Sequence, residues 1–294
     1  MSQPSRSFAP FDFLQLLAIA LIWGVNNVAA KITVMELPPL LAAVLRFSFT
    51  LICLIWWIKP FPREKWRTAA IMLLCMGPLH FGVLFSGLSM AEDLAPMVVA
   101  MQLWAPASVV FAAMFLGERV GVLRWLGVIA AFLGIAIIAF DPRVFEQGWA
   151  LAIVCAASCI YGLGATLIRS VGPGLSPAAM QAWVAVSTAS ILGAGSALFE
   201  RDQAHALEQA SWIVWVSVLF GGLVSSVGAN LMLYRLVQKY EVSRTTPYLL
   251  LAPLISFTLG ALILGDPLTW RIALGAAASM AGVALVALAE RRRV

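Results

Sequence analysis

His80 is the one histidine that lies within an apolar segment of the sequence, so it is the first candidate for chemistry there. A histidine can change its charge near neutral pH. His80 could therefore carry protons, contact a solute, or remain a neutral, hydrogen-bonded residue. The other histidine, His205, falls in a loop between apolar segments and is assigned no function.

Arg46 lies about six residues, or ~9 Å, inside another apolar segment. A cation at the centre of a membrane span costs about 2.5 to 3.5 kcal/mol on insertion scales, so it usually faces a cavity or a partner. No carboxylate of the sequence falls at a matching depth. Three roles remain open for Arg46: to hold backbone carbonyls at a broken helix, to extend toward the membrane surface, or to bind the carboxylate of a solute.

Amide and aromatic side chains form the second group of candidates. Asn26 and Asn27 share a helical face with Trp23 and Ala30 by three- and four-residue spacing. An unpartnered amide in hydrocarbon is costly, so both should point into a helix bundle, where they either bind a solute or bridge helices. Residues at four-residue steps predict a cavity lining further along the chain: Gly222, Ser226, Asn230 and Tyr234. Other groups suited to an amino-acid backbone or an aromatic side chain are Gln102, Trp104, Tyr161 and Tyr248.

The remaining side chains argue against an enzyme. Every carboxylate maps to a loop, a segment end or a terminus, so neither paired acids nor a metal-binding carboxylate cluster is expected inside the membrane. The four cysteines fall inside apolar runs and are expected to be core thiols rather than disulfides or metal ligands. We expect no catalytic residue, no metal and no cofactor.

The segments that hold these residues have the length and composition of membrane spans. Hydrophobic residues make up 62% of the 294 and charged residues 11%, against about 25% charged residues in soluble domains. A chain of this composition is expected to be an all-α integral membrane protein with lipid as its solvent. Ten spans are predicted, at 13–33, 40–58, 68–88, 95–116, 123–140, 149–168, 177–199, 211–234, 245–264 and 270–289.

The basic residues predict the orientation of these spans. Of the 19 Lys and Arg, 14 fall on the side of the N-terminus, four fall on the other side, and Arg46 lies within a span. Cytoplasmic loops carry the excess of Lys and Arg, so both termini are expected in the cytoplasm. The basic residues are scattered over short loops, which excludes a nucleic-acid surface. No removable signal peptide is recognised at the N-terminus.

An internal duplication is visible in the sequence. Leu116-Gly117-Glu118 and Leu264-Gly265-Asp266 are each followed by a turn and a helix with two glycines, and all these residues are separated from their counterparts by 148 positions. Such spacing indicates two copies of one unit. Because each copy holds five spans, an odd number, the second copy must enter the membrane from the opposite side. Glu118 and Asp266 are expected to cap the helices that follow them.

Several motifs together resemble the EamA-type family of the drug/metabolite transporter superfamily. They are Trp23-Gly24 in the first span, Arg46-Phe47 in the second, Ala105-Pro106 in the fourth, Leu116-Gly117-Glu118 after it, and weaker echoes of these in the second half. The resemblance implies two inverted five-helix repeats, at 13–140 and 149–289, around a central cavity formed by spans one, three, four, six, eight and nine. It also implies export of amino acids, with the exporters of cysteine-related and aromatic amino acids as the most similar group.

The resulting hypothesis is a secondary exporter of the bacterial inner membrane that moves amino acids or related small metabolites by alternating access, as a monomer or a weak homodimer. Its expected substrate-binding residues are those named above: Trp23, Asn26, Asn27, Arg46, His80, Gln102, Trp104, Tyr161, Ser226, Asn230, Tyr234 and Tyr248. Two alternatives stay open, namely an importer or exchanger of another metabolite, such as a nucleoside or a vitamin, and a passive solute channel. Lys31 and Arg169 are expected to extend toward the membrane surface or to act at a gate.

Overall fold

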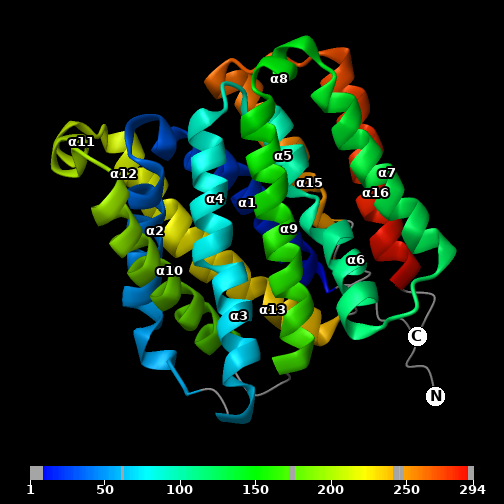
Figure 1. Cartoon of the computed structure of the whole chain (residues 1–294), viewed down its shortest axis with the longest axis horizontal. Coiled ribbons are helices and arrows are strands. Elements are labelled where there is room, and N and C mark those ends of the chain that lie inside the picture. The colour runs from blue at the N-terminus through cyan, green and yellow to red at the C-terminus, as the bar shows by residue number, and fades with distance from the viewer. Residues whose placement is uncertain (1–8, 61–62, 172–175, 241–244, 246–247, 291–294) are drawn as a thin grey trace.

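The computed structural model describes residues 9–60, 63–171, 176–240, 245 and 248–290, and every regular element in these ranges is a helix (Figure 1). Within them, nine apolar helical segments are long enough to cross a bilayer. The first five are α1 (Pro10–Glu36), α2 with η1 (Pro39–Leu54, Ile55–Trp57), α3 with α4 (Trp66–Met76, Pro78–Met90), α5 with α6 (Leu94–Met101, Trp104–Leu116) and α7 (Val122–Ala139). The other four are α9 (Gly148–Val171), α10 (Pro177–Phe199), α12 with η3 and α13 (Trp212–Leu219, Phe220–Ala229, Asn230–Lys239) and α16 (Trp270–Glu290).

The expected span at 245–264 is represented by a shorter apolar helix, α15 with η4 (Leu251–Leu259, Gly260–Leu264). Residues 246–247, in its expected first turn, lie outside the described residues. Three short helices connect the spans, namely η2 (Arg63–Lys65), α8 (Pro142–Glu146) and α11 (Gln203–Gln209). The chain is thus a multi-pass membrane protein that is all-helical over its described residues, where nine long apolar segments and one shorter segment match the ten expected spans.

Proline and glycine set many of the helix ends. Pro10, Pro39, Pro78, Pro142 and Pro177 each begin a helix, where the missing N–H of proline would have no partner in any case. The glycines of the duplicated motif end helices in the left-handed conformation, with φ of +64° at Gly117 and +78° at Gly265. These positions require glycine because a Cβ atom is strained there.

Three of the spans are irregular close to their middle. The third span is broken at Gly77, directly before Pro78. The fourth is broken at Gln102 and Leu103, shortly before Pro106. The span near residues 212–236 changes into a π-helix, η3, over Phe220–Ala229. Such widened turns rearrange which side chains share a face, and they often occur at functional sites.

The helices α7 and α16 pack side by side at one edge of the bundle (Figure 1). A Cβ atom on Gly134 would lie 2.5 Å from the carbonyl oxygen of Gly275, and one on Gly127 would lie 2.7 Å from the carbonyl oxygen of Gly282. Because the residue number rises along α7 as it falls along α16, the two helices are antiparallel. The glycines therefore allow close contact between two helices of one chain.

Other helix contacts occur in matching pairs. Helix α1 packs against α15, and α9 packs against α6. Likewise α1 packs against α12 and η3, while α9 packs against α3 and α4. Helices α2 and α10 pack against each other. In each pair, every span of one half is replaced by the span at the same position in the other half.

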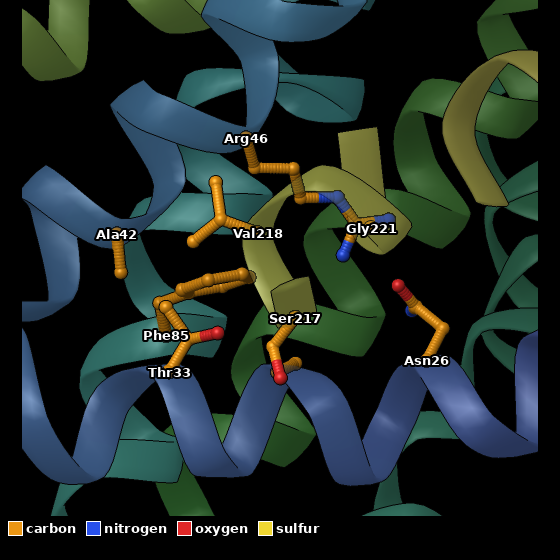
Figure 2. Close-up of a pocket in the computed structure, with 9 residues that line it drawn as sticks. Asn26, Thr33, Ala42, Arg46, Phe85, Ser217, Val218 and Gly221 are labelled. Atoms are coloured by element: carbon orange, nitrogen blue, oxygen red, sulfur yellow. The ribbon is translucent and has the colours of Figure 1, made fainter. Parts of the chain in front are cut away.

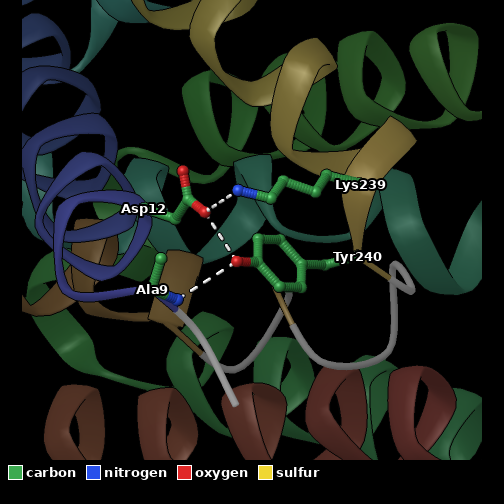
Figure 3. Close-up of polar contacts among 4 residues, drawn as sticks. All are labelled: Ala9, Asp12, Lys239 and Tyr240. Atoms are coloured by element: carbon green, nitrogen blue, oxygen red, sulfur yellow. Dashed lines mark hydrogen bonds and ion pairs between the residues drawn. The ribbon is translucent and has the colours of Figure 1, made fainter. Parts of the chain in front are cut away.

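Polar contacts tie the two ends of α1 to other spans. At its beginning, Asp12 accepts hydrogen bonds from Lys239 Nζ at 2.5 Å and from Tyr240 Oη at 2.6 Å (Figure 3). Tyr240 Oη also accepts from the backbone N–H of Ala9 at 3.1 Å. At its other end, Glu36 accepts hydrogen bonds from the N–H and the hydroxyl of Ser211, at 2.7 and 2.8 Å. Helix α1 is therefore attached at both ends to the span that contains η3.

The expected cap at Asp266 is wrong in its target. Asp266 Oδ2 accepts hydrogen bonds from the N–H groups of Leu94 and Ala95, both at 3.0 Å, so it caps α5 and not the following helix α16. Burial raises the pKa of Asp266, and the two N–H groups oppose that rise. The sequence shows that an acid follows the glycine, but only the packing of distant spans decides which helix end it meets.

The Lys31 side chain reaches the end of the third span, where it is covered by protein. Its side chain is buried, and Nζ donates hydrogen bonds to the carbonyl oxygens of Leu88, at 3.0 Å, and of Ala91, which end α4. A cation at a helix C-terminus satisfies carbonyls that have no partner within the helix. The side chain of Arg169, for which a similar position was expected, lies outside the described residues.

Candidate functional site

A small buried cavity lies where α1, α2, α4 and the span of α12 and η3 meet (Figure 2). It has room for about one water molecule in this conformation. Both halves of the chain contribute to it, and its nine lining residues are Asn26, Ala30, Thr33, Ala42, Arg46, Phe85, Ser217, Val218 and Gly221. None of these nine residues is acidic.

Arg46 points from α2 into this cavity and is only 8% exposed. Its Nε and Nη2 groups donate to one atom, the Ser226 hydroxyl oxygen, at 3.2 and 3.1 Å. The guanidinium also lies 5.8 Å from the ring centre of Phe47 and 5.5 Å from that of Phe81. No acidic side chain in the described part of the chain forms an ion pair with Arg46. Arg46 thus neither extends to the membrane surface nor holds backbone carbonyls.

The π-helix η3 places Ser226 beside Arg46. The Ser226 hydroxyl donates to the carbonyl oxygen of Gly221 at 2.9 Å, five residues earlier in the chain. Gly222 allows η3 to approach α2 closely, because a Cβ atom there would lie 2.7 Å from the carbonyl oxygen of Arg46. The Thr50 hydroxyl joins the same two helices, at 3.1 Å from the Arg46 carbonyl and 3.0 Å from the Gly222 carbonyl.

Asn26 enters the cavity from α1, opposite Arg46 (Figure 2). Its Oδ1 atom is buried and has no hydrogen-bond partner among the described residues. Leaving such an acceptor unpaired costs about 1 to 3 kcal/mol. Gly221 lies between the two groups, since a Cβ atom there would be 3.3 Å from Asn26 Oδ1 and 3.5 Å from Arg46 Nε. The cavity therefore contains an unpaired acceptor on one side and a cation on the other.

Asn27 bridges helices instead of facing the cavity. Its Nδ2 donates to the Ser256 hydroxyl of α15 at 3.0 Å, and that hydroxyl lies 3.0 Å from the carbonyl oxygen of Gly24 in α1. The two neighbouring asparagines thus separate into one cavity residue and one that joins α1 to α15. Their adjacency in sequence could not distinguish these roles, because neighbouring positions on a helix differ in direction by about 100°.

His80, Tyr161 and Trp104 form an aromatic group on three different spans. The ring centres of His80 and Tyr161 are 4.8 Å apart, and those of Tyr161 and Trp104 are 5.8 Å apart. His80 Nδ1 lies 2.8 Å from the carbonyl oxygen of Ala157 and donates a hydrogen bond to it. Phe81 connects this group to the Arg46 site, because its ring lies 4.6 Å from that of His80. In this conformation these rings lie outside the cavity lining.

The other expected site residues also lie outside the cavity lining. Trp23 and Tyr248 pack against a buried apolar cluster that includes Leu16 and Ile19. Gln102 follows the last residue of α5, and Asn230 and Tyr234 belong to α13. None of the four residues of the stripe Gly222, Ser226, Asn230 and Tyr234 lines the cavity, and the first two belong to η3 and contact Arg46 of α2.

The cavity also differs from the expected one in its helices. Spans one, three and eight line it as expected, but span two contributes Ala42 and Arg46, and spans four, six and nine contribute none of the lining residues. Thr33 and Ser217 are lining residues that sequence reasoning missed. Thr33 continues the face of Asn26 and Ala30 at helical spacing, so the signal was present. Ser217, one hydroxyl in an apolar run, offered none.

Comparisons with known proteins agree with this architecture. The chain is 27% identical over 272 residues to an uncharacterized transporter of Archaeoglobus fulgidus, covering 90% of this chain and 94% of that protein. It is 24% identical over 285 residues to a probable amino-acid metabolite efflux pump of Escherichia coli, covering 92% and 93%. A solved crystal structure is similar to this chain with a TM-score of 0.63, and the match covers 97% of this chain and 99% of the chain in that structure. The two sequences are 19% identical, so this similarity shows the fold alone.

A family model matches the chain twice. The model describes the EamA-like transporter family, and its two matches cover residues 12–140 and 148–288. Together the matches span nearly the whole sequence. The chain therefore belongs to the EamA-like transporter family, and it is a membrane transporter and not an enzyme.

Proposed function

We propose that this chain is a secondary transporter of the bacterial inner membrane that exports amino acids or related small metabolites by alternating access. The observation that carries the proposal is the cavity at Arg46, which is buried among spans from both halves of the chain. Transporters built from repeats bind their solute near the bilayer midplane, at the interface of the repeats. Export is supported by the Escherichia coli relative, whose name describes a probable amino-acid metabolite efflux pump.

The two halves are proposed to be inverted five-helix repeats, at 13–140 and 149–289. The antiparallel contact of α7 and α16 supports this, because these are the fifth spans of the two halves. Gly127 contacts Gly282, which is the counterpart of Gly134 in the second half. Gly134 in turn contacts Gly275, which is the counterpart of Gly127. A twofold axis between the halves would produce such an exchange, and the paired contacts of the other helices support the same axis.

Ten crossings are proposed, with both termini in the cytoplasm. Tyr240 contacts Asp12 at the beginning of α1, whereas Asp266 contacts Leu94, which lies near the other end of α1. Leu94 is placed near that end because Lys31, close to the end of α1, donates a hydrogen bond to the carbonyl of Ala91, three residues before Leu94. The chain from 240 to 266 would therefore cross the full thickness of the bundle, which makes α15 with η4 part of a tenth span. Tags on the two termini should be accessible from the same, cytoplasmic, face.

Transport by purified protein in liposomes tests the proposal. Vesicles are loaded with unlabelled amino acids, and the uptake of labelled ones is followed with and without a pH gradient. The proposal predicts saturable uptake that is accelerated by amino acid on the opposite side. Conduction without saturation would identify a channel instead. Movement of cationic dyes or nucleosides, but of no amino acid, would assign another substrate.

A further inference from the structure

We propose that the cavity binds the charged backbone of a zwitterionic amino acid, with Arg46 holding the carboxylate and Asn26 Oδ1 accepting a hydrogen bond from the ammonium group. The inference rests on the proposed function and assigns the substrate class to one site. Arg46 lacks an anionic partner and Asn26 Oδ1 lacks a hydrogen-bond donor among the described residues. A bound amino acid would supply both partners.

Arg46 has an incomplete set of partners. A guanidinium carries five N–H donors in a planar fork that fits the two oxygens of a carboxylate. Here two of its nitrogens share the single Ser226 hydroxyl, which is uncharged. Since no acid in the described part of the chain pairs with it, the positive charge is buried without a counter-charge. A carboxylate that enters the cavity would replace Ser226 and form the stronger, charge-assisted pair.

Asn26 provides the opposite chemistry. Its Oδ1 atom accepts no hydrogen bond from any described residue, so an N–H donor of the solute would satisfy it. The hydroxyl groups of Thr33 and Ser217 line the same cavity and can accept from an ammonium as well. Because no lining residue is acidic, a simple cation would meet only the charge of Arg46. The site therefore favours a solute that carries both an anionic and a cationic group.

Gly221 sets the space between these two groups. The absence of a side chain leaves open the region between Asn26 Oδ1 and Arg46 Nε, 3.3 and 3.5 Å from where a Cβ atom would lie. An amino acid places its carboxylate and its ammonium on one carbon, which suits a short gap of this kind. In the present conformation the cavity holds about one water molecule, so binding must also move α1 away from η3.

The test compares four ligands that share one side chain. Leucine carries both the ammonium and the carboxylate. In leucinamide the carboxylate is replaced by an uncharged amide. Isopentylamine carries the ammonium alone, and 4-methylpentanoate carries the carboxylate alone. A second series uses the phenylalanine side chain. Binding to purified protein is measured by thermal shift and by intrinsic tryptophan fluorescence. The wild-type protein is expected to bind the amino acid at least tenfold more tightly than the other three ligands.

Two variants should lose different parts of this preference. Arg46→Gln is expected to weaken amino-acid binding at least tenfold and to bind acid and amide alike, while Arg46→Lys retains part of the difference. Asn26→Leu is expected to bind the amino acid no better than its deaminated acid, yet still to reject the amide. Asn27→Leu is the matched control, because Asn27 joins α1 to α15 outside the cavity, and it should keep the wild-type order of ligands.

A further variant keeps the test decisive if Arg46→Gln does not fold. Asn26→Asp places a carboxylate opposite Arg46, so it is expected to raise the melting temperature and to abolish amino-acid binding. Unchanged binding in Asn26→Asp or in Arg46→Gln would overturn the proposal. Equal binding of amino acid and amide by the wild-type protein, or binding of chloride or phosphate with no competition by amino acids, would also overturn it.

The outcomes for this site and for the proposed function are separable. If the protein shows the expected ligand preferences but no transport in liposomes, the proposed binding site stands and the proposed export function is overturned. Saturable amino-acid transport that is unchanged in Arg46→Gln would keep the function and overturn the site.

Discussion

Gly221 is the residue whose size most directly limits the cavity. A methyl group there would lie 3.5 Å from Arg46 Nε, which is ordinary van der Waals contact, and 3.3 Å from Asn26 Oδ1, so the Asn26 side chain would have to shift by a few tenths of an ångström. We therefore expect Gly221→Ala to fold as stably as the wild-type protein, to within about 1 kcal/mol, and to lose most of its transport. The measurement is the initial rate of labelled amino-acid uptake into liposomes.

Gly228→Ala is the matched control for Gly221→Ala, because both glycines lie in η3 and the nearest atom to a Cβ at position 228 is 3.7 Å away. Gly228 does not line the cavity. Equal transport by the two alanine variants would contradict the placement of the solute between Asn26 and Arg46.

Lys31 is expected to contribute to stability through the carbonyl groups that it satisfies. Lys31→Met keeps much of the volume but leaves the carbonyls of Leu88 and Ala91 without this partner, so we expect a loss of about 1 to 3 kcal/mol in the free energy of unfolding. Thermal unfolding in detergent measures it. The control is Lys59→Met, whose side chain is exposed. A Lys31→Met variant as stable as this control would show that burial of the charge cancels the benefit of its hydrogen bonds.

Single residues were predictable where one physical rule decided their environment. The depth of Arg46 and the cost of an unpaired amide at Asn26 both required a cavity or a partner, and both residues line the cavity. The rule could not decide between Asn26 and Asn27, because it applies equally to both. It also could not place Lys31, whose partners lie 57 and 60 residues away in the chain.

At the scale of elements, the contact of α7 with α16 holds the edge of the bundle together. A Cβ atom on Gly134 would lie 2.5 Å from backbone atoms of Gly275 and Ser279, which cannot move independently of their helix. Gly134→Ala is therefore expected to separate the two helices and to destabilise the protein by about 1 to 3 kcal/mol or more. Thermal unfolding in detergent provides the comparison. Gly121→Ala, at a position just before α7 with no atom within 4 Å, should unfold like the wild-type protein.

The contact of Asp12 with Lys239 joins the beginning of α1 to the end of α13 and is expected to restrain their separation (Figure 3). We expect Asp12→Asn or Lys239→Gln to expose the cavity from that side. The reporter is a single cysteine introduced by Ala30→Cys, in a chain without its native cysteines, and labelled by a membrane-impermeant maleimide. The rate should rise severalfold in either variant, and the double variant should add little more.

The same contact predicts a dependence on pH. The hydrogen bond to Asp12 raises the pKa of Lys239 above its ordinary value. The contact is therefore fully present below that ordinary value and is lost as the pH rises through the raised one. Labelling of the Ala30→Cys reporter should accelerate in that range, and Lys239→Gln should abolish the acceleration. An identical pH profile in the variant would show that another group is responsible.

The sequence predicted the elements better than their irregularities. Apolar length predicted the spans, and the duplicated motif predicted the turns at Gly117 and Gly265. The π-helix η3 left no such signal, because Phe220–Ala229 is as apolar and as regularly spaced as an α-helix. Within η3, the Ser226 hydroxyl donates to the carbonyl oxygen of Gly221, five residues earlier, and accepts a hydrogen bond from Arg46.

At the scale of the whole molecule, the two halves of the chain both contribute to the cavity at Arg46. The duplicated motif predicted the halves, and the family matches at 12–140 and 148–288 fall on both of them. The position of the cavity could not be predicted in the same way. It depends on which spans of the two halves approach most closely, and that is decided by close contacts such as Gly222 against the backbone of Arg46.

Protection of the Ala30→Cys reporter by substrate tests the central claim most directly, because Ala30 lines the cavity between Asn26 and Thr33 along α1. The labelling rate is measured in liposomes against increasing amino-acid concentration. The account predicts that labelling slows with a half-maximal concentration equal to that of transport, and that Arg46→Gln removes the protection. Saturable transport with no change in the labelling rate would contradict it, since the transported solute would then bind elsewhere.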